Sequence, residues 1–212
     1  MLYLFLAVIV GYLLGSIPGG WIVGKGLRGV DVRKYGSGNI GMTNVLRVLG
    51  KKEALLVLLI DLGKGMAAIF IAGLLPAKIN PPLVKALAGI ACISGHNWPI
   101  FLKFRGGKGV ATSAGVFLLL TPLPLFFCVL TMVLVVALTR YVSVGSMTSA
   151  ALLPFYIWVL MGKQSFLYIV LGMVVAAIVI LRHRSNLKRL LSGKENKLGM
   201  KIGDLSRFNN SL

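Results

Sequence analysis

Residues 110–139 read VATSAGVFLLLTPLPLFFCVLTMVLVVALT, a run of thirty residues without a charged side chain. An apolar run of about 18 or more residues is typical of a helix that spans the hydrocarbon core of a membrane. Thirty residues exceed one such helix, and the prolines of Thr121-Pro122-Leu123-Pro124 interrupt the run. Because proline breaks helical hydrogen bonding, we expect two helices, at 110–120 and 123–139. The first is short, so one merged span or a re-entrant segment is the alternative.

The remainder of the chain has the same apolar character. Of its 212 residues, 57% are hydrophobic and 13% are charged, and the mean hydropathy is +0.89. In a soluble domain about a quarter of the residues are charged. The first apolar run lacks a basic segment before it and is followed by further runs, so we interpret it as a retained helix and not a signal peptide. We predict an all-α polytopic membrane protein, a single integral membrane domain over 1–212, with seven spans at 2–23, 54–75, 82–102, 110–120, 123–139, 144–161 and 166–181.

Basic residues are distributed unevenly between the connections. The chain has 23 Lys and Arg against 5 Asp and Glu, a net charge of +18. With seven spans, 19 basic residues fall on one side of the membrane and three on the other, while Lys64 lies inside a span. Cytoplasmic loops carry the excess of Lys and Arg, so we expect the N-terminus outside and the C-terminus in the cytoplasm. Merging the fourth and fifth spans would move Arg140 and the basic tail outward, so the charges favour seven. This topology also accounts for the high pI, and no nucleic-acid partner is expected.

The first cytoplasmic connection contains Gly36-Ser37-Gly38-Asn39-Ile40-Gly41-Met42-Thr43-Asn44-Val45-Leu46-Arg47. Its glycines permit positive φ and expose backbone N–H groups, and such a concave turn can hold an anion. Thr43 or Asn44 is expected to cap a short helix, whose N-terminus would add its dipole. The alternative is an ordinary flexible loop.

The second connection carries Arg105-Gly106-Gly107-Lys108-Gly109, which runs directly into the helix expected at 110–120. Two cations, free amides and a helix N-terminus together favour an anion. This is no ATP-binding Walker A loop, because Gly109 follows Lys108 where that motif has Ser or Thr. The alternative is a pair of flanking cations that reach lipid headgroups, which would not explain the glycines.

The third cluster ends the last span and reads RHRSNLKRLLSGKENK at 182–197. At helical spacing His183 and Asn186 share a face, with Arg182, Ser185 and Arg189 along its edge. The alternative is a solvated basic flank. His183 and His96 are the two side chains whose ordinary pKa lies near neutrality.

Other reactive side chains are few. Two His and few carboxylates make a poor metal site, so no metal is expected. Cys92 and Cys128 lie inside apolar runs, where burial as small hydrophobic residues is expected. Asp61 and Lys64 are three residues apart within the second span, and either neutralise each other structurally or serve function.

Together the three connections resemble the bacterial acyl-phosphate:glycerol-3-phosphate acyltransferases. The matching pieces are GSGNIGMTN at 36–44 with Arg47, Gly95-His96 through KGVAT at 108–112, and RHRSN at 182–186 running on to Lys194-Glu195. The likeness covers the whole chain in order, length and hydropathy. Met42 and Arg105 depart from the commoner family residues, Ala and Lys, but leave size or charge suitable.

The resemblance implies acyl transfer from acyl phosphate to the 1-hydroxyl of glycerol 3-phosphate, giving lysophosphatidic acid, at the cytoplasmic face of the bacterial inner membrane. It implies a lipid bilayer environment, with no cofactor and no obligate protein partner. Carried onto this chain, Ser37, Gly38, Asn39, Arg47 and Lys108 would hold phosphate, and His183 and Asn186 would place glycerol 3-phosphate. His183, with His96 behind it, is the candidate general base; the alternative base is a substrate phosphate oxygen. The wider candidate substrate-binding set adds Gly36, Gly41, Thr43, Asn44, His96, Arg105, Gly106, Gly107 and Gly109.

Two other classes remain open from the residues alone. A transporter for an organic anion would explain the spans and the basic loops, but usually has its site at the bilayer midplane between repeats, and no repeat is visible. A membrane adaptor that binds anionic lipid through its basic tail would leave the glycine-rich connections unexplained.

Overall fold

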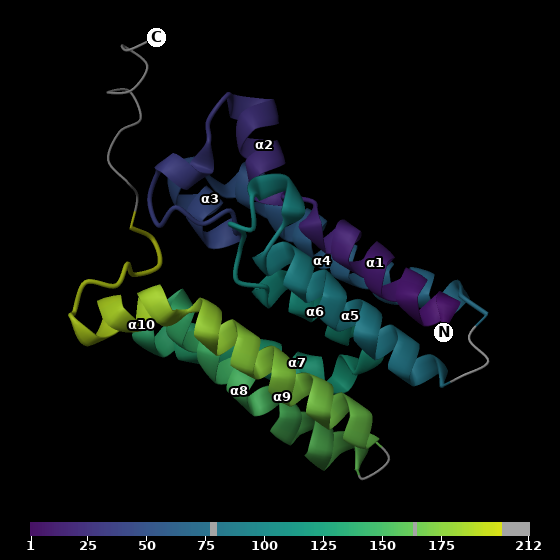
Figure 1. The fold of residues 1–212 in the computed structure, drawn as a ribbon. Helices are drawn as coiled ribbons and strands as arrows, with labels where there is room; N and C mark the ends of the chain where they lie inside the picture. The colour runs from purple at the N-terminus through teal and green to yellow at the C-terminus, as the bar shows by residue number, and fades with distance from the viewer. Residues whose placement is uncertain (77–79, 163–164, 201–212) are drawn as a thin grey trace.

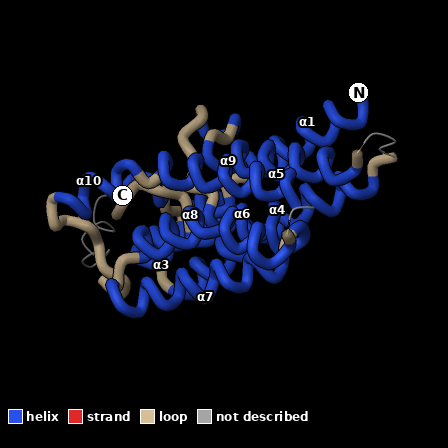
Figure 2. Tube along the Cα trace, turned by 90° about the horizontal axis from the view of Figure 1, so that it is seen from below, coloured by secondary structure: helices blue, strands red, loops and turns tan. Residues whose placement is uncertain are grey.

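The computed structural model describes residues 1–76, 80–162 and 165–200. Within these ranges the chain forms α-helices without a β-strand, joined by connections of which 29–41 and 98–109 are the longest (Figures 1 and 2). The helices are α1 (Leu2–Ser16), α2 (Gly19–Arg28), α3 (Met42–Val48), α4 (Lys51–Leu74), α5 (Pro81–Asn97), α6 (Val110–Leu120), α7 (Pro122–Thr139), α8 (Val142–Met161), α9 (Phe166–Arg182) and α10 (Arg184–Leu191), with 3-10 turns η1 (Val32–Lys34) and η2 (Ile100–Leu102).

The long apolar run divides where its prolines predict. Thr121 separates α6 from α7 and has φ −146° and ψ 70°, outside the helical region. Pro122 begins α7, where its missing N–H costs nothing because the first turn has no internal acceptor for it. The prediction of two helices at this place is confirmed.

Two predicted helices differ from expectation near a proline: the first is broken at Pro18, and the third ends before Pro99. The run 2–23 was expected as one helix, but α1 stops at Ser16 and α2 restarts after Pro18. The run 82–102 was expected to continue through Pro99, but α5 stops at Asn97. Proline disfavours the helical conformation of the residue before it, and the sequence interpretation gave this effect too little weight.

The lengths of the helices support an integral membrane protein. Four segments are long and apolar enough to cross a bilayer, namely Leu2–Arg28 with its break, Lys51–Leu74, Pro122–Thr139 and Val142–Met161. A fifth is the pair Phe166–Arg182 and Arg184–Leu191, which is bent by 55°. Helix α6 rises only about 16 Å at 1.5 Å per residue, about half a hydrocarbon core. Length and composition thus identify four or five spans in the described chain, fewer than the seven expected.

Small residues let the helices approach closely. A Cβ atom on Gly15 of α1 would lie 2.0 Å from the carbonyl oxygen of Cys92 in α5. A Cβ on Gly115 of α6 would likewise lie 2.0 Å from the carbonyl oxygen of Leu62 in α4. Lipid provides no hydrophobic drive between helices, so close backbone packing through glycine is a common substitute. These contacts hold α1 on α5 and α6 on α4.

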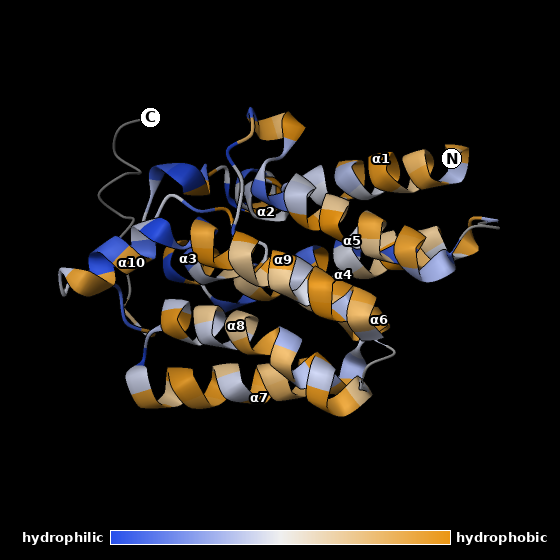
Figure 3. Cartoon of the chain, turned by 60° about the horizontal axis from the view of Figure 1, so that its bottom comes forward, coloured by the Kyte–Doolittle hydropathy of each residue, from blue (hydrophilic) through white to orange (hydrophobic). Residues whose placement is uncertain are grey.

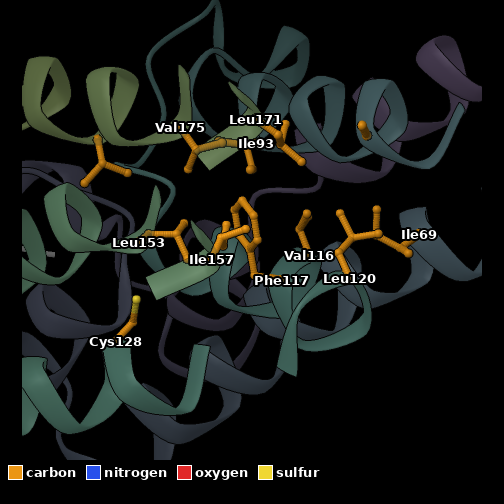
Figure 4. Packing of buried hydrophobic residues seen from close by; sticks show 12 residues of the cluster. Ile69, Ile93, Val116, Phe117, Leu120, Cys128, Leu153, Ile157, Leu171 and Val175 are labelled. Carbon is orange, nitrogen blue, oxygen red and sulfur yellow. The ribbon is translucent and has the colours of Figure 1, made fainter. Parts of the chain in front are cut away.

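One of three clusters of buried apolar side chains lies mainly between α5, α6, α8 and α9; the others lie around α2, α3 and α4 and between α1, α4 and α5. Phe117 and Val116 of α6 face Ile93, Ile157 and Val175 in the first of these clusters (Figure 4). The polar residues lie elsewhere: the hydrophilic segments concentrate at the end of the bundle that holds α3 and α10 (Figure 3). The packing therefore brings the three motif-bearing connections to one end of the molecule.

Candidate functional site

The first glycine turn, residues 36–41, is organised by one buried side chain. Asn44 accepts a hydrogen bond from the Ser37 N–H at its Oδ1 (2.8 Å). Its Nδ2 donates to the carbonyl oxygens of Val32 (3.0 Å), Tyr35 (3.2 Å) and Asn39 (2.9 Å). Gly36 and Gly38 have φ of 61° and 69°, which glycine adopts without strain. The Asn44 amide therefore shapes the turn.

The expected helix cap in this turn is wrong. Gly41 is the N-cap of α3, and neither Thr43 nor Asn44 caps the helix with its side chain. Instead Asn39 Oδ1 accepts a hydrogen bond from the Gly41 N–H (2.8 Å) just before the helix. Thr43 lies half-buried in the first helical turn. The helix begins at Met42, earlier than expected, so Thr43 and Asn44 lie inside its first turn and not at the cap position.

The second glycine turn, residues 106–109, is held from two sides. On one side the Gly107 N–H donates to the carbonyl oxygen of His96 (3.0 Å). On the other side Arg182 donates from Nε and Nη2 to the carbonyl oxygen of Gly107 (3.0 and 2.9 Å) and from Nη2 to that of Gly106 (3.2 Å). The Arg182 guanidinium also lies over the Trp98 ring, 5.3 Å from its centroid. Gly107 therefore offers no free N–H to a ligand.

The third connection holds the key side chains at a bend. His183 is the residue between α9 and α10, and its Nδ1 donates to the carbonyl oxygen of Val179 (2.8 Å). A carbonyl can only accept, so the Nε2 of the neutral ring carries the free lone pair. Asn186, one turn further, receives a short hydrogen bond from Lys108 Nζ at its Oδ1. Lys108 and Asn186, from connections far apart in sequence, thus meet directly.

Glu195 completes this arrangement and was outside the candidate set. Its carboxylate accepts from Asn186 Nδ2 (2.6 Å), Arg189 Nε (2.7 Å) and the Ser143 hydroxyl (3.0 Å). Burial alone would raise the pKa of Glu195, but these hydrogen bonds bring it below the ordinary value. The carboxylate therefore stays charged and fixes the Asn186 amide, so that Asn186 presents its oxygen to Lys108.

A cavity of about 490 Å³ opens between these connections, within the usual range for ligand sites. It is lined by Ser37, Asn39, Trp98, Lys108, Leu181, Arg182, Arg184, Ser185 and Arg189. Four of these nine residues are Lys or Arg and none is acidic. A cavity with this lining attracts an anion and can form charge-assisted hydrogen bonds to it.

Burial shifts the ionisation of several groups around the cavity. It lowers the pKa of Lys108 to about 8, and the nearby Glu195 opposes that shift. It lowers the pKa of His183 to about 4, and the positive charge of Lys108 adds to the effect. Burial also lowers the pKa of Arg47, which donates to the Asn196 carbonyl oxygen (3.4 Å). At neutral pH the site therefore combines charged Lys and Arg with an uncharged histidine.

The candidate residues divide into those at the cavity and those away from it. Ser37, Asn39 and Lys108 line it, and Asn186 contacts Lys108. Arg105 is exposed and outside the lining. His96 is buried in another cluster, described below. The edge formed by Arg182, Ser185 and Arg189 does line the cavity, so helical spacing had carried the signal for three residues outside the candidate set. Arg184 and Glu195 belong to the stretch that carries the family resemblance, but no property of the individual residue singled out either of them or Trp98.

Helical spans and a cationic cavity at the helix ends together define an integral membrane protein with a site suited to an anion. A family model described as glycerol-3-phosphate acyltransferase matches residues 5–193. The chain belongs to this family.

Relatives with this name align along nearly the whole chain. The glycerol-3-phosphate acyltransferase of Thermoanaerobacter sp. (strain X514) is 45% identical over 94% of this chain and 98% of its own. Glycerol-3-phosphate acyltransferase 2 of Moorella thermoacetica is 47% identical over 92% of this chain and 97% of its own.

Two crystal structures of PlsY (YgiH), an integral membrane glycerol 3-phosphate acyltransferase, have the same fold at 38% identity. The glycerol 3-phosphate form has a TM-score of 0.85 and covers 92% of this chain and 96% of that chain. The lysophosphatidic acid form has a TM-score of 0.82 and covers 92% and 95%. These relatives favour an acyltransferase over a transporter or an adaptor.

Proposed function

We propose that this chain transfers a fatty acyl group from acyl phosphate to the 1-hydroxyl of glycerol 3-phosphate, releasing lysophosphatidic acid and inorganic phosphate. The observation that carries the proposal is the cavity with four Lys or Arg and no acidic lining residue. Both substrates are anionic, so their phosphates repel each other when held close together. Several cations in a partly buried site offset that repulsion.

Within this site we assign the phosphate contacts to Ser37, Gly38, Asn39, Arg47 and Lys108. Lys108 has its ammonium group fixed by Asn186 at the cavity wall. Ser37 contributes its hydroxyl, because its N–H is engaged by Asn44. Positioning of this kind is a large part of catalysis when the acyl donor is already activated. Lys108 is also placed to stabilise charge on the carbonyl oxygen as the hydroxyl attacks.

His183 and Asn186 are assigned to glycerol 3-phosphate. The hydroxyl oxygen attacks the acyl carbonyl, the bond to the leaving phosphate breaks, and the hydroxyl proton must be taken up. His183 Nε2 has a lone pair available, but a pKa near 4 makes it a weak base at neutral pH. We therefore assign the proton to a phosphate oxygen and hydrogen-bond acceptance to His183. No acyl-enzyme forms in this scheme.

The acyl chain has an apolar place next to the cationic cavity. A second cavity, of about 70 Å³, lies between α6, α7, α8 and α9. Its walls include Val110, two residues after Lys108, and Val179, whose carbonyl oxygen binds His183. A donor with its phosphate on Lys108 can therefore direct its chain between the apolar helices.

For topology we propose seven spans in a bacterial inner membrane, with α1–α2 as the first span and α6 as a short fourth. The N-terminus lies outside and the C-terminus in the cytoplasm. The support is the distribution of Lys and Arg along the sequence. Single cysteines test it. Tyr3→Cys should react with a membrane-impermeant maleimide in intact cells, and Lys188→Cys only after permeabilisation. The reverse pattern would invert the topology.

The activity itself is tested with purified protein in detergent. Acyl phosphate and glycerol 3-phosphate together should yield lysophosphatidic acid, and omission of either should yield none. Acyl-CoA in place of acyl phosphate serves as the donor control and should be inactive. A folded sample that forms no product would support the transporter alternative.

The proton assignment has its own test. His183→Gln retains a hydrogen-bonding side chain without a titratable ring. We expect a raised KM for glycerol 3-phosphate with turnover at saturating substrate reduced by less than about tenfold, below the range typical of losing a general base. A larger loss of turnover would make His183 the base. An acyl group trapped on Ser37 would contradict direct transfer.

A further inference from the structure

Asp61, Lys64 and His96 form a charged cluster outside the cavity lining. They are buried, with exposed fractions of 1%, 6% and 4%. Lys64 Nζ lies 2.8 Å from Asp61 Oδ1 and 2.8 Å from His96 Nδ1, and donates to the carbonyl oxygen of Ile17 (2.9 Å). Asp61 and Lys64 form an ion pair, the first of the two alternatives that the sequence left open. Removing such an ion pair from water costs free energy of desolvation. Neutralisation of Asp61 by Lys64 does not by itself explain why Lys64 also binds a histidine.

The hydrogen bonds fix the orientation of the His96 ring. An ammonium group only donates, so Nδ1 must accept from Lys64 and the ring proton lies on Nε2. Asp61 in turn fixes Lys64, with Asp61 Oδ1 also 3.3 Å from His96 Nδ1. The cluster thus holds the ring in one position, with its Nε2 edge directed to the second glycine turn.

His96 packs directly against the backbone of that turn. A Cβ on Gly107 would lie 1.9 Å from His96 Nε2, and 2.7 and 2.8 Å from two other ring atoms. A Cβ on Gly106 would lie 2.2 Å from the His96 carbonyl oxygen. With Arg182 binding the opposite side, residues 106 and 107 are clamped between His96 and Arg182. The next residue in the chain is Lys108.

We propose that His96 is a positioning residue. The Asp61–Lys64 pair holds its ring, the ring fixes the position of the Gly107 backbone, and this in turn places Lys108 in the cavity. It touches no substrate and transfers no proton. This inference rests on the proposed function in assigning Lys108 to phosphate. It replaces the earlier expectation that His96 binds substrate or serves as a second base.

Steric compensation tests the inference. Gly107→Ala in the wild-type background should push the turn off the ring and lower kcat/KM about 100-fold, the effect expected of a displacement near 1 Å. His96→Asn keeps an oxygen at the Nδ1 position to accept from Lys64 but removes the Nε2 edge. We expect it to cost about tenfold. In the double variant the contacts of 1.9 and 2.7 Å are removed, and the remaining one of 2.8 Å is to the end of a smaller side chain that can shift. Adding Gly107→Ala to His96→Asn should therefore cost less than about threefold more.

The kcat/KM values of the two single variants and the double variant distinguish between the possible roles of His96. If His96 were a base or a substrate ligand, the double variant would be at least as inactive as Gly107→Ala alone, and the inference would be overturned. Gly63→Ala in α4 is the control, because a Cβ there meets nothing within 4 Å; it should behave as wild type.

A readout that needs no activity separates this inference from the proposed function. The midpoint of thermal unfolding in detergent should fall for Gly107→Ala and recover when His96→Asn is added. If Gly107→Ala does not fold, recovery of folded protein in the double variant is the equivalent result. Absence of recovery in both readouts overturns the inference. A wild type that makes no lysophosphatidic acid but shows the thermal recovery would contradict only the proposed function.

Discussion

The two glycine turns at the cavity are built differently. The turn at 36–41 is held by Asn44, whose four hydrogen bonds reach residues at most 12 positions away. The turn at 106–109 is held by Arg182, 75 positions away, and by His96, which Lys64 and Asp61 fix from another helix. The first is a local unit attached to α3. The second exists only when α4, α5 and α9 have packed.

This difference indicates which substitutions should disturb each turn. A locally closed turn depends for its stability on its own central side chain, and distant helices matter little. A turn clamped between helices transmits every displacement of those helices to the residue it carries. That residue is Lys108, and its hydrogen bond to Asn186 also crosses between helices. The second turn should therefore be the more sensitive part of the site.

The largest effect is expected for Lys108→Met, which keeps the length of the side chain and removes its charge. Loss of a positioned, half-buried cation at developing negative charge costs about 100- to 1000-fold in turnover. The measurement is kcat/KM for lysophosphatidic acid formation. Ser37→Ala, the matching change in the first turn, should cost less because it removes no charge. Equal losses would contradict the difference between the turns.

Arg182→Lys should come next, with a loss of about 10- to 100-fold in kcat/KM. Lysine keeps the charge but cannot bind the carbonyl oxygens of Gly106 and Gly107 with two nitrogens at once. The exposed Arg33→Lys is the control for the same exchange and should match wild type. Near-normal activity of Arg182→Lys would show that the clamp from α9 is dispensable.

The pH dependence of kcat/KM should show an alkaline limb at about pH 8. Lys108 must be charged to hold phosphate, and burial lowers its pKa to about 8 in the free enzyme. Activity should therefore fall about tenfold between pH 7 and pH 9 as Lys108 loses its proton. Lys108→Arg, which stays charged, should move this limb upward whatever its absolute activity. An unmoved limb would assign it to another group.

The burial of His183 predicts that the stability of the folded protein changes with pH. The pKa of His183 is lowered to about 4 in the folded protein, so between pH 4 and its ordinary value near 6.5 the unfolded chain binds the extra proton. Stability from this group should therefore be fully present above about pH 6.5 and decline as the pH falls toward 4. Thermal midpoints of wild type and His183→Gln across this range measure the difference, and parallel curves would contradict it.

The smallest effect on catalysis is expected for Asn44→Ala in the first turn. It leaves three carbonyl oxygens and one N–H without their partner, at a cost of about 1–3 kcal/mol of stability. Asn44→Asp keeps the acceptor for the Ser37 N–H and removes the donor, so it separates the two halves of the amide. Thermal unfolding gives the stability. A loss of activity greater than that of Arg182→Lys would reverse the ranking of the turns.

Sequence reasoning succeeded where the signal is local. Apolar length located the helical runs, and Pro122 with Pro124 divided α6 from α7 as expected. It failed at Pro18 and Pro99, where the apolar run continues past the end of a helix, because hydropathy does not register backbone geometry. It also singled out Ser37, Asn39 and Lys108, which line the cavity, and Asn186, which contacts Lys108, because cations, glycines and histidine in three short motifs are unusual together. The roles assigned to these residues and to His183 stay predictions.

The sequence by itself determined that the chain is a helical membrane protein with basic, glycine-rich connections, since length of apolar runs and residue type are properties of consecutive residues. Only the tertiary structure decided what each polar residue does. It directed Asn44 inward to hold a turn, buried His96 with Asp61 and Lys64, and brought Glu195 to Asn186. These roles depend on which partner lies within about 3 Å, and helix packing sets that distance between residues far apart in the chain.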